Sequence, residues 1–262
     1  MIFDCHCHSS ISSDSPTPMA DMAAAAAAHA LGITFTEHVD CGFPSPKLKN
    51  ADAAEYLDTF RTVREAHPDY AVLRGVELGF EYGFEAESKA FVRAIDPDLV
   101  ICSVHSLDGM TLYCDEKYPE GHQHEVYSRY LAKVRDSIRL CRDFDVVGHI
   151  GFVAKRAKYP DPQIEYDEFR DELDEILRLI IDTGHALEAN TSGFLTVGGT
   201  LPQRAILRRY RELGGELLTI GSDAHRPQYV GFHFPDAIEM IKSCGFTHLT
   251  HYEKRKAVLL PL

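Results

Sequence analysis

Segments typical of β-strands and of α-helices alternate along this 262-residue chain, and this alternation restricts its fold more than any other feature. Runs of apolar and β-branched residues predict strands at 2–7, 33–36, 71–78, 98–103, 145–148, 185–189 and 217–221. Helical patterns lie at about 18–30, 52–66, 84–94, 124–142, 165–182, 201–213 and 235–243. Strict alternation predicts an α/β fold with a mainly parallel sheet and helices outside it.

The strand number and the length favour a single domain. Seven predicted strands and no second block of composition indicate one domain, residues 1–262, closed or nearly closed as a barrel. One-domain α/β barrels have about 250 residues, and their active sites lie at the carboxyl ends of the strands. The loops 39–51 and 106–123 leave from that end and are candidate walls of a substrate pocket.

Composition excludes several classes of protein. No run reaches the roughly 18 apolar residues needed to cross a membrane. The net charge of −13 disfavours a nucleic-acid polymer as partner, because phosphate-backbone binding requires a basic surface. The seven cysteines show no disulfide framework and no signal peptide opens the chain, so we expect reduced thiols and a cytoplasmic location. The oligomeric state does not follow from the sequence.

Polar residues close nearly every predicted strand. The segments are His6-Cys7-His8, Thr36-Glu37-His38, Gly75-Val76-Glu77, Ser103-Val104-His105, Val147-Gly148-His149, Glu188-Ala189-Asn190 and Ser222-Asp223-Ala224-His225. In a barrel these side chains are expected to converge at one rim. Alternate residues of a strand share a face, so His6 and His8 should point one way and the buried Cys5 and Cys7 the other.

Imidazoles and carboxylates in one cluster predict a metal centre. The candidate ligands are His6, His8, Asp14, His38, Glu77, His105, His149, Asp223 and His225. This donor set suits Zn, Mn or Fe, and the lack of thiolates argues against a closed structural zinc site. Nine ligands are too many for one ion and suit two or three divalent ions with a bridging carboxylate. Such clusters, with ions about 3.5–4 Å apart, catalyse phosphoester hydrolysis.

The order of these motifs resembles that of the PHP (polymerase and histidinol phosphatase) superfamily. His6-Cys7-His8, Glu77, Ser103-Val104-His105, Gly148-His149 and Ser222-Asp223-Ala224-His225 match it over essentially the whole chain. The segment 103–109, Lys155-Arg156 and the ending 253–256 are similar to the histidinol-phosphate phosphatase branch. The resemblance implies a distorted (β/α)7 barrel with a trinuclear site.

The resemblance also implies a role for each ligand. The first ion would be held by His6, His8, Glu77 and Asp223, the second by Glu77, His105 and His149, and the third by Asp14, His38 and His225. Many superfamily members have His where this chain has Asp14. The implied reaction is in-line hydrolysis of a phosphate monoester by a metal-bridging hydroxide. Glu77 as the bridge, and Asp223 or His225 as proton donor to the leaving alkoxide, are the candidate catalytic residues.

Substrate contacts are open between two interpretations. Arg156 suits a phosphate group, or it is a solvated loop cation beside Lys155. Asn190 and Ser192 either donate to phosphate or form a turn. Asp108 and Glu81 either meet a cationic substrate group or are ordinary loop acids. Glu188 is expected to support the site rather than to bind a metal.

Three functions are compatible with these observations. The first is hydrolysis of L-histidinol phosphate, a small-molecule phosphate ester, in histidine biosynthesis. The second is a PHP phosphoesterase acting on nucleotides or oligonucleotide ends. The third is a non-catalytic metal-binding domain, which the complete set of nine ligands disfavours. An amidohydrolase-type deaminase is disfavoured because His105, rather than Lys or a carboxylate, ends the fourth strand.

Overall fold

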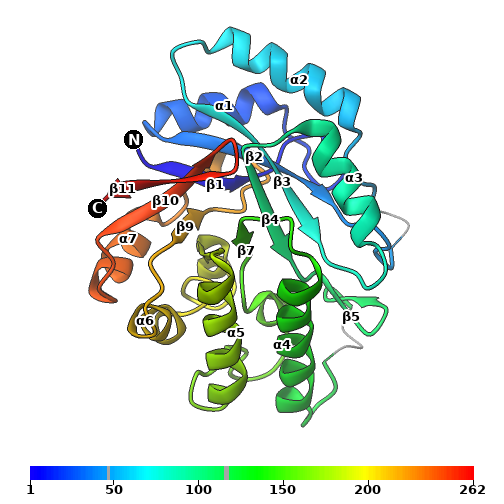
Figure 1. The fold of residues 1–262 in the computed structure, drawn as a ribbon, viewed down its shortest axis with the longest axis vertical. Coiled ribbons are helices and arrows are strands. Elements are labelled where there is room, and N and C mark those ends of the chain that lie inside the picture. The colour runs from blue at the N-terminus through cyan, green and yellow to red at the C-terminus, as the bar shows by residue number, and fades with distance from the viewer. Residues whose placement is uncertain (46–47, 115–117) are drawn as a thin grey trace.

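The computed structural model describes residues 1–45, 48–114 and 118–262 and contains one sheet of seven parallel strands (Figure 1). The order is β1-β2-β3-β4-β7-β8-β9. Their bounds are Phe3–Cys7, Gly32–Val39, Val72–Gly79, Leu99–Ser103, Val146–Val147, Ala186–Asn190 and Leu218–Gly221. Beyond β9 the chain returns to β1, where the His8 N–H donates to the Ala224 carbonyl (2.9 Å). The sheet is therefore a nearly closed barrel, as the alternation predicted.

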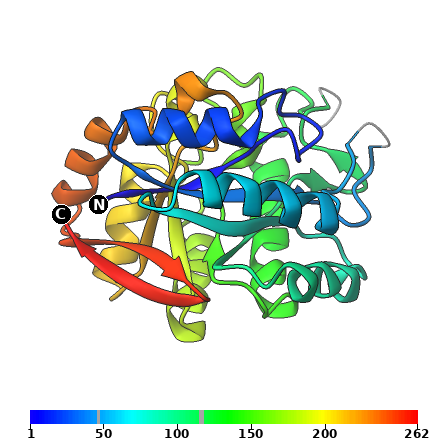
Figure 2. The ribbon, with the colours of Figure 1, turned by 90° about the horizontal axis from the view of Figure 1, so that it is seen from above.

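Helices surround this barrel (Figures 1 and 2). In the described chain they are α1 (Met19–Ala28), α2 (Ala53–Ala66), α3 (Glu85–Ile95), α4 (Gln123–Leu140), α5 (Arg170–Thr183), α6 (Arg204–Glu212) and α7 (Phe234–Ser243). The prediction of a helix from 165 was wrong at its start, because residues before Arg170 form turns. Both chain termini lie on the same side of the molecule (Figure 2).

The two faces of each strand belong to different cores. Outward-facing side chains such as Val76, Val100 and Leu187 pack with the helices in the large core. Inside the barrel, near the strand starts, Leu99 and Val146 form a smaller apolar cluster. Toward the carboxyl ends of the strands the interior of the barrel is narrow. A β-carbon at Gly148 would collide with Ser103, and one at Gly221 would collide with His6. Apolar packing thus fills one end of the barrel, and polar side chains occupy the other.

A hairpin that the sequence did not predict closes the apolar end. It consists of β10 (His248–Glu253) and β11 (Lys256–Pro261), and Tyr252 packs into the inner apolar cluster. Its turn residues Lys254 and Arg255 have φ of 49° and 63°. Tight hairpin turns with positive φ are usually recognised by Asn-Gly or Asp-Gly. The absence of that signal explains the missed hairpin.

A second hairpin lies in the loop 106–123. Ser106–Leu107 (β5) pairs with Met110–Thr111 (β6) around Asp108-Gly109, where both residues have positive φ. Part of this loop and of the loop 39–51 lines the cavity described below, as expected. Residues 46–47 and 115–117 of these loops lie outside the described residues.

The prediction that Cys5 and Cys7 share a face was wrong. Both are buried, but Cys5 packs in the inner cluster whereas Cys7 packs with the helices. The reason is an irregularity in β1, whose pairing register with β2 shifts between Asp4 and Cys7. The extra residue leaves His6 and His8 on the same side, as predicted.

Candidate metal centre

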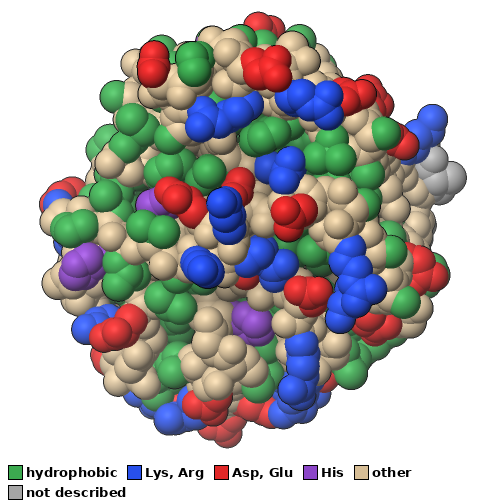
Figure 3. Space-filling model, turned by 45° about the horizontal axis from the view of Figure 1, so that its top comes forward, with side chains coloured by type: hydrophobic (Ala, Val, Ile, Leu, Met, Phe, Trp, Pro, Cys, Tyr) green, Lys and Arg blue, Asp and Glu red, His purple; other side chains and the backbone are tan. Residues whose placement is uncertain are grey.

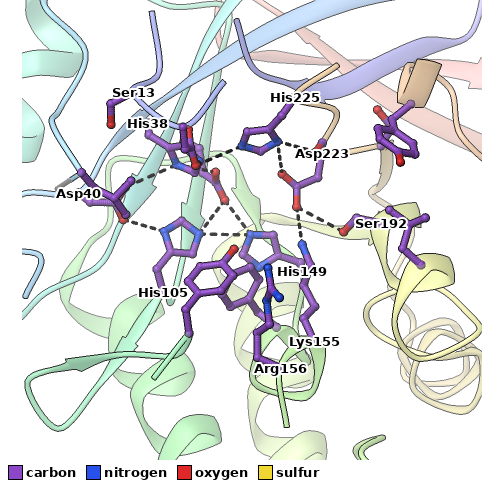
Figure 4. Close-up of a pocket in the computed structure, with 18 of the residues that line it drawn as sticks. Ser13, His38, Asp40, His105, His149, Lys155, Arg156, Ser192, Asp223 and His225 are labelled. Atoms are coloured by element: carbon purple, nitrogen blue, oxygen red, sulfur yellow. Dashed lines mark hydrogen bonds and ion pairs between the residues drawn. The ribbon is translucent and has the colours of Figure 1, made fainter. Parts of the chain in front are cut away.

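A cavity of about 530 Å³ opens at the carboxyl ends of the barrel strands (Figure 4). Its described lining includes seven of the nine predicted ligands, namely Asp14, His38, Glu77, His105, His149, Asp223 and His225. The remaining two, His6 and His8, are completely buried and lie against Glu77. The structure therefore brings all nine side chains together.

Local contacts fix the backbone on which these residues lie. The buried Asp4 carboxylate accepts hydrogen bonds from the Ser222 N–H (2.9 Å) and the Gly231 N–H (2.9 Å), so it ties β1 to the segment after β9. Asp223 itself has φ of 56°, an uncommon conformation for a residue with a β-carbon. Its N–H donates to the His6 carbonyl at 2.8 Å, which helps hold this conformation.

A second carboxylate positions the loop after β1. Glu37 is completely buried and accepts hydrogen bonds from the N–H groups and hydroxyls of Ser9 and Ser12. The Ser12 hydroxyl in turn accepts from the His38 N–H at 3.0 Å. The loop that leads to Asp14 is thus fixed next to His38.

Glu77 lies at the centre of the cluster, and its Oε1 faces one pair of imidazoles. This atom lies 2.7 Å from His149 Nε2 and 3.1 Å from His105 Nε2, and it accepts from the Ser103 hydroxyl at 2.6 Å. The two histidines follow β7 and β4, so one carboxylate oxygen joins residues from three strands.

The other oxygen of Glu77 faces a second set of imidazoles. Oε2 lies 3.1 Å from His6 Nε2, 3.1 Å from His38 Nδ1 and 3.5 Å from His8 Nε2. Among the described residues none of these four buried atoms has a hydrogen-bond partner. Burying unpaired polar atoms costs free energy, and atoms that converge in this way are what a cation requires.

The outer part of the cluster adds two carboxylates. Asp223 Oδ1 lies 3.4 Å from His8 Nε2, and Asp14 Oδ2 lies 3.3 Å from His225 Nε2 and 3.5 Å from His38 Nε2. Each carboxylate therefore faces at least one imidazole nitrogen.

Three groups of side chains within the cluster have the composition and spacing of metal sites. They are His6, His8 and Glu77; His38, Glu77 and His105; and His8, His38 and His225. In each group the potential ligand atoms lie within 4.8 Å of one another. Imidazole and carboxylate donors of this kind suit Zn, Mn or Fe, so the residues present fit the ions that the sequence predicted.

Electrostatics in the cluster favour cations. Burial raises the pKa of Glu77, but His6, His105 and His38 outweigh it and hold that pKa well below its usual value. Burial lowers the pKa of His105, yet Asp40 and Glu77 raise it to about 10. Glu77 thus remains negative, and its charge is compensated by protons on the imidazoles or by metal ions.

Two carboxylates support the cluster from behind. Glu188 Oε1 lies 2.6 Å from His6 Nδ1, and its Oε2 accepts from the His149 N–H at 2.7 Å. This is the supporting position expected for Glu188. Asp40 was not predicted: its Oδ1 lies 2.6 Å from His105 Nδ1. Such contacts fix the orientation of the imidazole ring and leave its Nε2 atom facing the place of the metal ion. The signal for Asp40 was its position two residues after His38, just beyond the end of β2.

Two cations lie at the cavity wall after β7. Lys155 Nζ lies 2.8 Å from Asp223 Oδ2 and above the Phe152 ring, so it is a site residue, a role that the sequence did not predict. Arg156 lines the cavity, and its guanidinium lies 5.0 Å from the centre of the Tyr113 ring. That position is compatible with its predicted contact to phosphate.

Of the other three residues predicted to contact the substrate, Ser192 lines the cavity, whereas Asn190 forms a turn and Asp108 lies away from the cavity. The Ser192 hydroxyl lines the cavity and lies 3.3 Å from Asp223 Oδ2. Asn190 Oδ1 accepts from the Ser192 N–H at 3.0 Å, which is the turn interpretation, although its Nδ2 has no partner among the described residues. The structure does not bring Asp108 to the cavity. It lies at the β5–β6 turn and pairs with Arg129 (3.1 Å) because the turn directs it outward.

Comparison with known proteins agrees with this geometry. A sequence model described as "PHP domain" matches residues 4–192. A probable histidinol-phosphatase from Clostridium acetobutylicum is 31% identical over 97% of this chain and 98% of its own length. The histidinol-phosphatase of Lactococcus lactis is 30% identical over 97% of this chain and 95% of its own.

A solved structure provides the same comparison in three dimensions. The crystal structure of histidinol phosphate phosphatase from Lactococcus lactis, complexed with zinc, L-histidinol and phosphate, superposes with a TM-score of 0.91. The two chains are 29% identical, and the match covers 98% of each. In the part of this chain that the structure describes, no helix combines the length and the apolar character required to traverse a bilayer.

Proposed function

Because this chain belongs to the PHP domain family, we propose that it is a metal-dependent phosphatase that hydrolyses L-histidinol phosphate to L-histidinol and phosphate. The observation that carries the proposal is the buried Glu77 carboxylate, whose Oε2 faces nitrogens of His6, His8 and His38 that have no hydrogen-bond partner among the described residues. The support for the substrate is the similarity to proteins named histidinol-phosphatases and to a structure that contains zinc, L-histidinol and phosphate.

Three ions account for the nine side chains. The first would be held by His6, His8, Glu77 and Asp223, the second by Glu77, His105 and His149, and the third by Asp14, His38 and His225. When bound, such ions supply positive charge for the phosphoryl oxygens and lower the pKa of the attacking water. We propose zinc as the first ion to test, because zinc is named in the related structure.

The protein's own residues orient the phosphate and move the proton. Lys155 and Arg156 add positive charge at one wall of the cavity, and the Ser192 hydroxyl can donate to a phosphoryl oxygen. Asp223 or His225 would pass the proton to the leaving oxygen, and His225 could do so only from a ring nitrogen that is not bound to the third ion. Burial raises the pKa of Asp223, but Lys155, His8 and His6 outweigh it and hold that pKa well below its usual value. A carboxylate so strongly ionised rarely carries a proton.

Charge on the surface is consistent with a small substrate. On the face shown in Figure 3, basic and acidic side chains are interspersed and do not form one continuous basic surface. The net charge is −13. Binding along a nucleic-acid backbone requires an extended positive surface.

The seven cysteines are free in the structure, which agrees with the proposed cytoplasmic location.

The test is a substrate panel with metal analysis of the same sample. Phosphate release from L-histidinol phosphate is compared with release from nucleoside monophosphates and a bisphosphate, with zinc or manganese added. We expect the highest kcat/KM for L-histidinol phosphate and more than one ion per chain. A higher kcat/KM for nucleotides would reject the substrate. Less than one ion per chain and no hydrolysis with either metal would instead favour a non-catalytic domain.

A further inference from the structure

A lysine is buried beside the cluster although it is not among the described residues that line the cavity. Lys133 lies in α4 and is only 4% exposed. Its Nζ donates to the Ser106 carbonyl (3.1 Å) and hydroxyl (2.8 Å) and lies 3.0 Å from Glu81 Oε1. The Ser106 hydroxyl also donates to the Glu81 carboxylate. Among the described residues the ammonium group therefore meets three oxygen acceptors, and Glu81 is a counterion for its charge.

The acceptors lie on the two segments that directly follow β3 and β4. Ser106 directly follows His105, and Glu81 lies four residues after Glu77. Between these segments the Phe80 N–H donates to the Ser103 carbonyl at 2.8 Å. Lys133 thus connects α4 to the extensions of both β3 and β4, which carry Glu77 and His105.

Packing alone does not require a lysine at this position. On the same helix Tyr130, Val134 and Ser137 are buried, so Lys133 belongs to the inward face of α4. A methionine has a similar length and could be buried there without removing an ammonium group from water. Replacing a buried ion pair by apolar side chains is often neutral or stabilising, so stability is a weak reason for this charge.

We propose that Lys133 is a positioning residue, which holds the Ser106 backbone and Glu81 together and thereby places His105 beside Glu77 for the second metal ion. Two contacts then define His105: Asp40 orients its ring, and Lys133 fixes the peptide unit that follows it. This inference rests on the proposed function, because it assumes that His105 and Glu77 share an ion.

The test is a zinc titration of Lys133→Met. Zinc binding to the full-length metal-free protein is measured by competition with a chromophoric chelator, and kcat and KM for L-histidinol phosphate are measured as zinc is raised. Outer partners of metal ligands typically contribute about 10- to 100-fold in metal affinity. We expect a weakening of that size for the second ion, unchanged affinity for the tightest ion, and a kcat that recovers at high zinc while KM changes little.

Two further variants separate positioning from general stability. Arg209→Met breaks the ion pair with Asp174 (2.6 Å) between α6 and α5, away from the cavity. It should lower the thermal midpoint but leave zinc affinity and kcat unchanged. The double variant Lys133→Met/Glu81→Gln removes the uncompensated charge that Lys133→Met leaves behind. Its affinity for zinc should remain as low as that of Lys133→Met.

Each contrary result overturns the proposal. Zinc affinity of Lys133→Met within twofold of the wild type would reject it, and so would recovery of affinity in the double variant. If Lys133→Met does not fold, Ser106→Ala decides, because it removes only the hydroxyl, with its contacts to Lys133 and Glu81, and leaves Lys133 bound to the Ser106 carbonyl and paired with Glu81. It should weaken zinc binding in the same direction, and wild-type affinity would reject the proposal. Failure of the proposed function has a different signature: the wild type itself then binds no second ion or does not hydrolyse L-histidinol phosphate.

Discussion

At the scale of single residues, Glu77 is the side chain on which the proposed metal centre most depends. Its two oxygens face different imidazoles, so one carboxylate can serve two ions at once. The side chain is completely buried, and the neighbouring histidines keep its pKa well below the usual value. A bridging role needs two oxygens that share a negative charge, and a carboxylate side chain provides them.

Glu77→Gln tests this role with almost no change in shape. The amide has one oxygen and no negative charge, so it cannot bridge two ions. We expect kcat to fall by more than about 100-fold, the upper range for loss of a supporting partner, with a lower zinc content measured on the same sample. Glu239→Gln, at an exposed position of α7, is the matched control and should change neither value. Normal zinc content and normal kcat in the Glu77→Gln variant would exclude the bridge.

Asp40 gives a second prediction for a single residue. Its carboxylate holds His105 Nδ1 at 2.6 Å, which fixes the ring with Nε2 toward Glu77. Asp40→Ala should weaken zinc binding about 10- to 100-fold, and Asp40→Asn, which can still accept this hydrogen bond, should weaken it less. Chelator competition measures both variants. Equal losses in the two variants would show that the charge of Asp40, rather than its hydrogen bond, is what matters.

At the scale of elements, the junction of α5 and β8 contains a histidine that makes folding sensitive to acid. His185 stacks on the Phe144 ring at 3.9 Å. Burial, with a contribution from Arg255, lowers its pKa from 6.5 to about 4. The folded protein therefore favours the neutral ring. Its contribution to stability is complete above pH 6.5 and is lost as the pH falls from 6.5 toward 4.

His185→Gln should remove this part of the acid sensitivity. Below pH 4 this contribution of His185 to the stability of the wild type is lost. The free energy of unfolding of the two proteins is compared in urea at about pH 7 and about pH 4.5, on either side of most of this titration. The variant should lose less stability than the wild type between these values, since the metal-site histidines contribute equally to both. Parallel losses would mean that His185 is not protonated on unfolding.

At the scale of the whole molecule, the two ends of the barrel have separate tasks. Imidazoles and carboxylates fill the end at the strand carboxyl termini, and the β10–β11 hairpin closes the opposite end with Tyr252. In such barrels the first end carries catalysis and the second contributes stability. Changes at one end should therefore have little effect on the other.

Tyr252→Ala tests this separation. Truncation of a large buried aromatic side chain typically costs about 3–5 kcal/mol, because a cavity remains. We expect the free energy of unfolding to fall by that amount while kcat and KM of the folded protein stay within about twofold of the wild type. Both are measured well below the thermal midpoint. A large loss of kcat in a fully folded Tyr252→Ala protein would show that the two ends are coupled.

The sequence by itself determined the barrel and the composition of its rim. The alternation of strands and helices allows few other architectures, and a polar residue that ends a parallel strand must lie at the common rim. His6, Glu77, His149 and Asp223 could therefore be predicted to meet although they are far apart in the chain. Glu188 could be assigned a supporting position for the same reason.

Only the tertiary structure decided which way particular side chains point and which residues they contact. The register shift in β1 separated Cys5 from Cys7, and the β5–β6 turn directed Asp108 to Arg129 and away from the cavity. Asp40, Lys155 and Lys133 are ordinary polar residues in the sequence, and their contacts with His105, Asp223 and Ser106 come from segments brought together by folding. Local patterns fix which strand end a residue occupies, but side-chain partners are set by long-range packing.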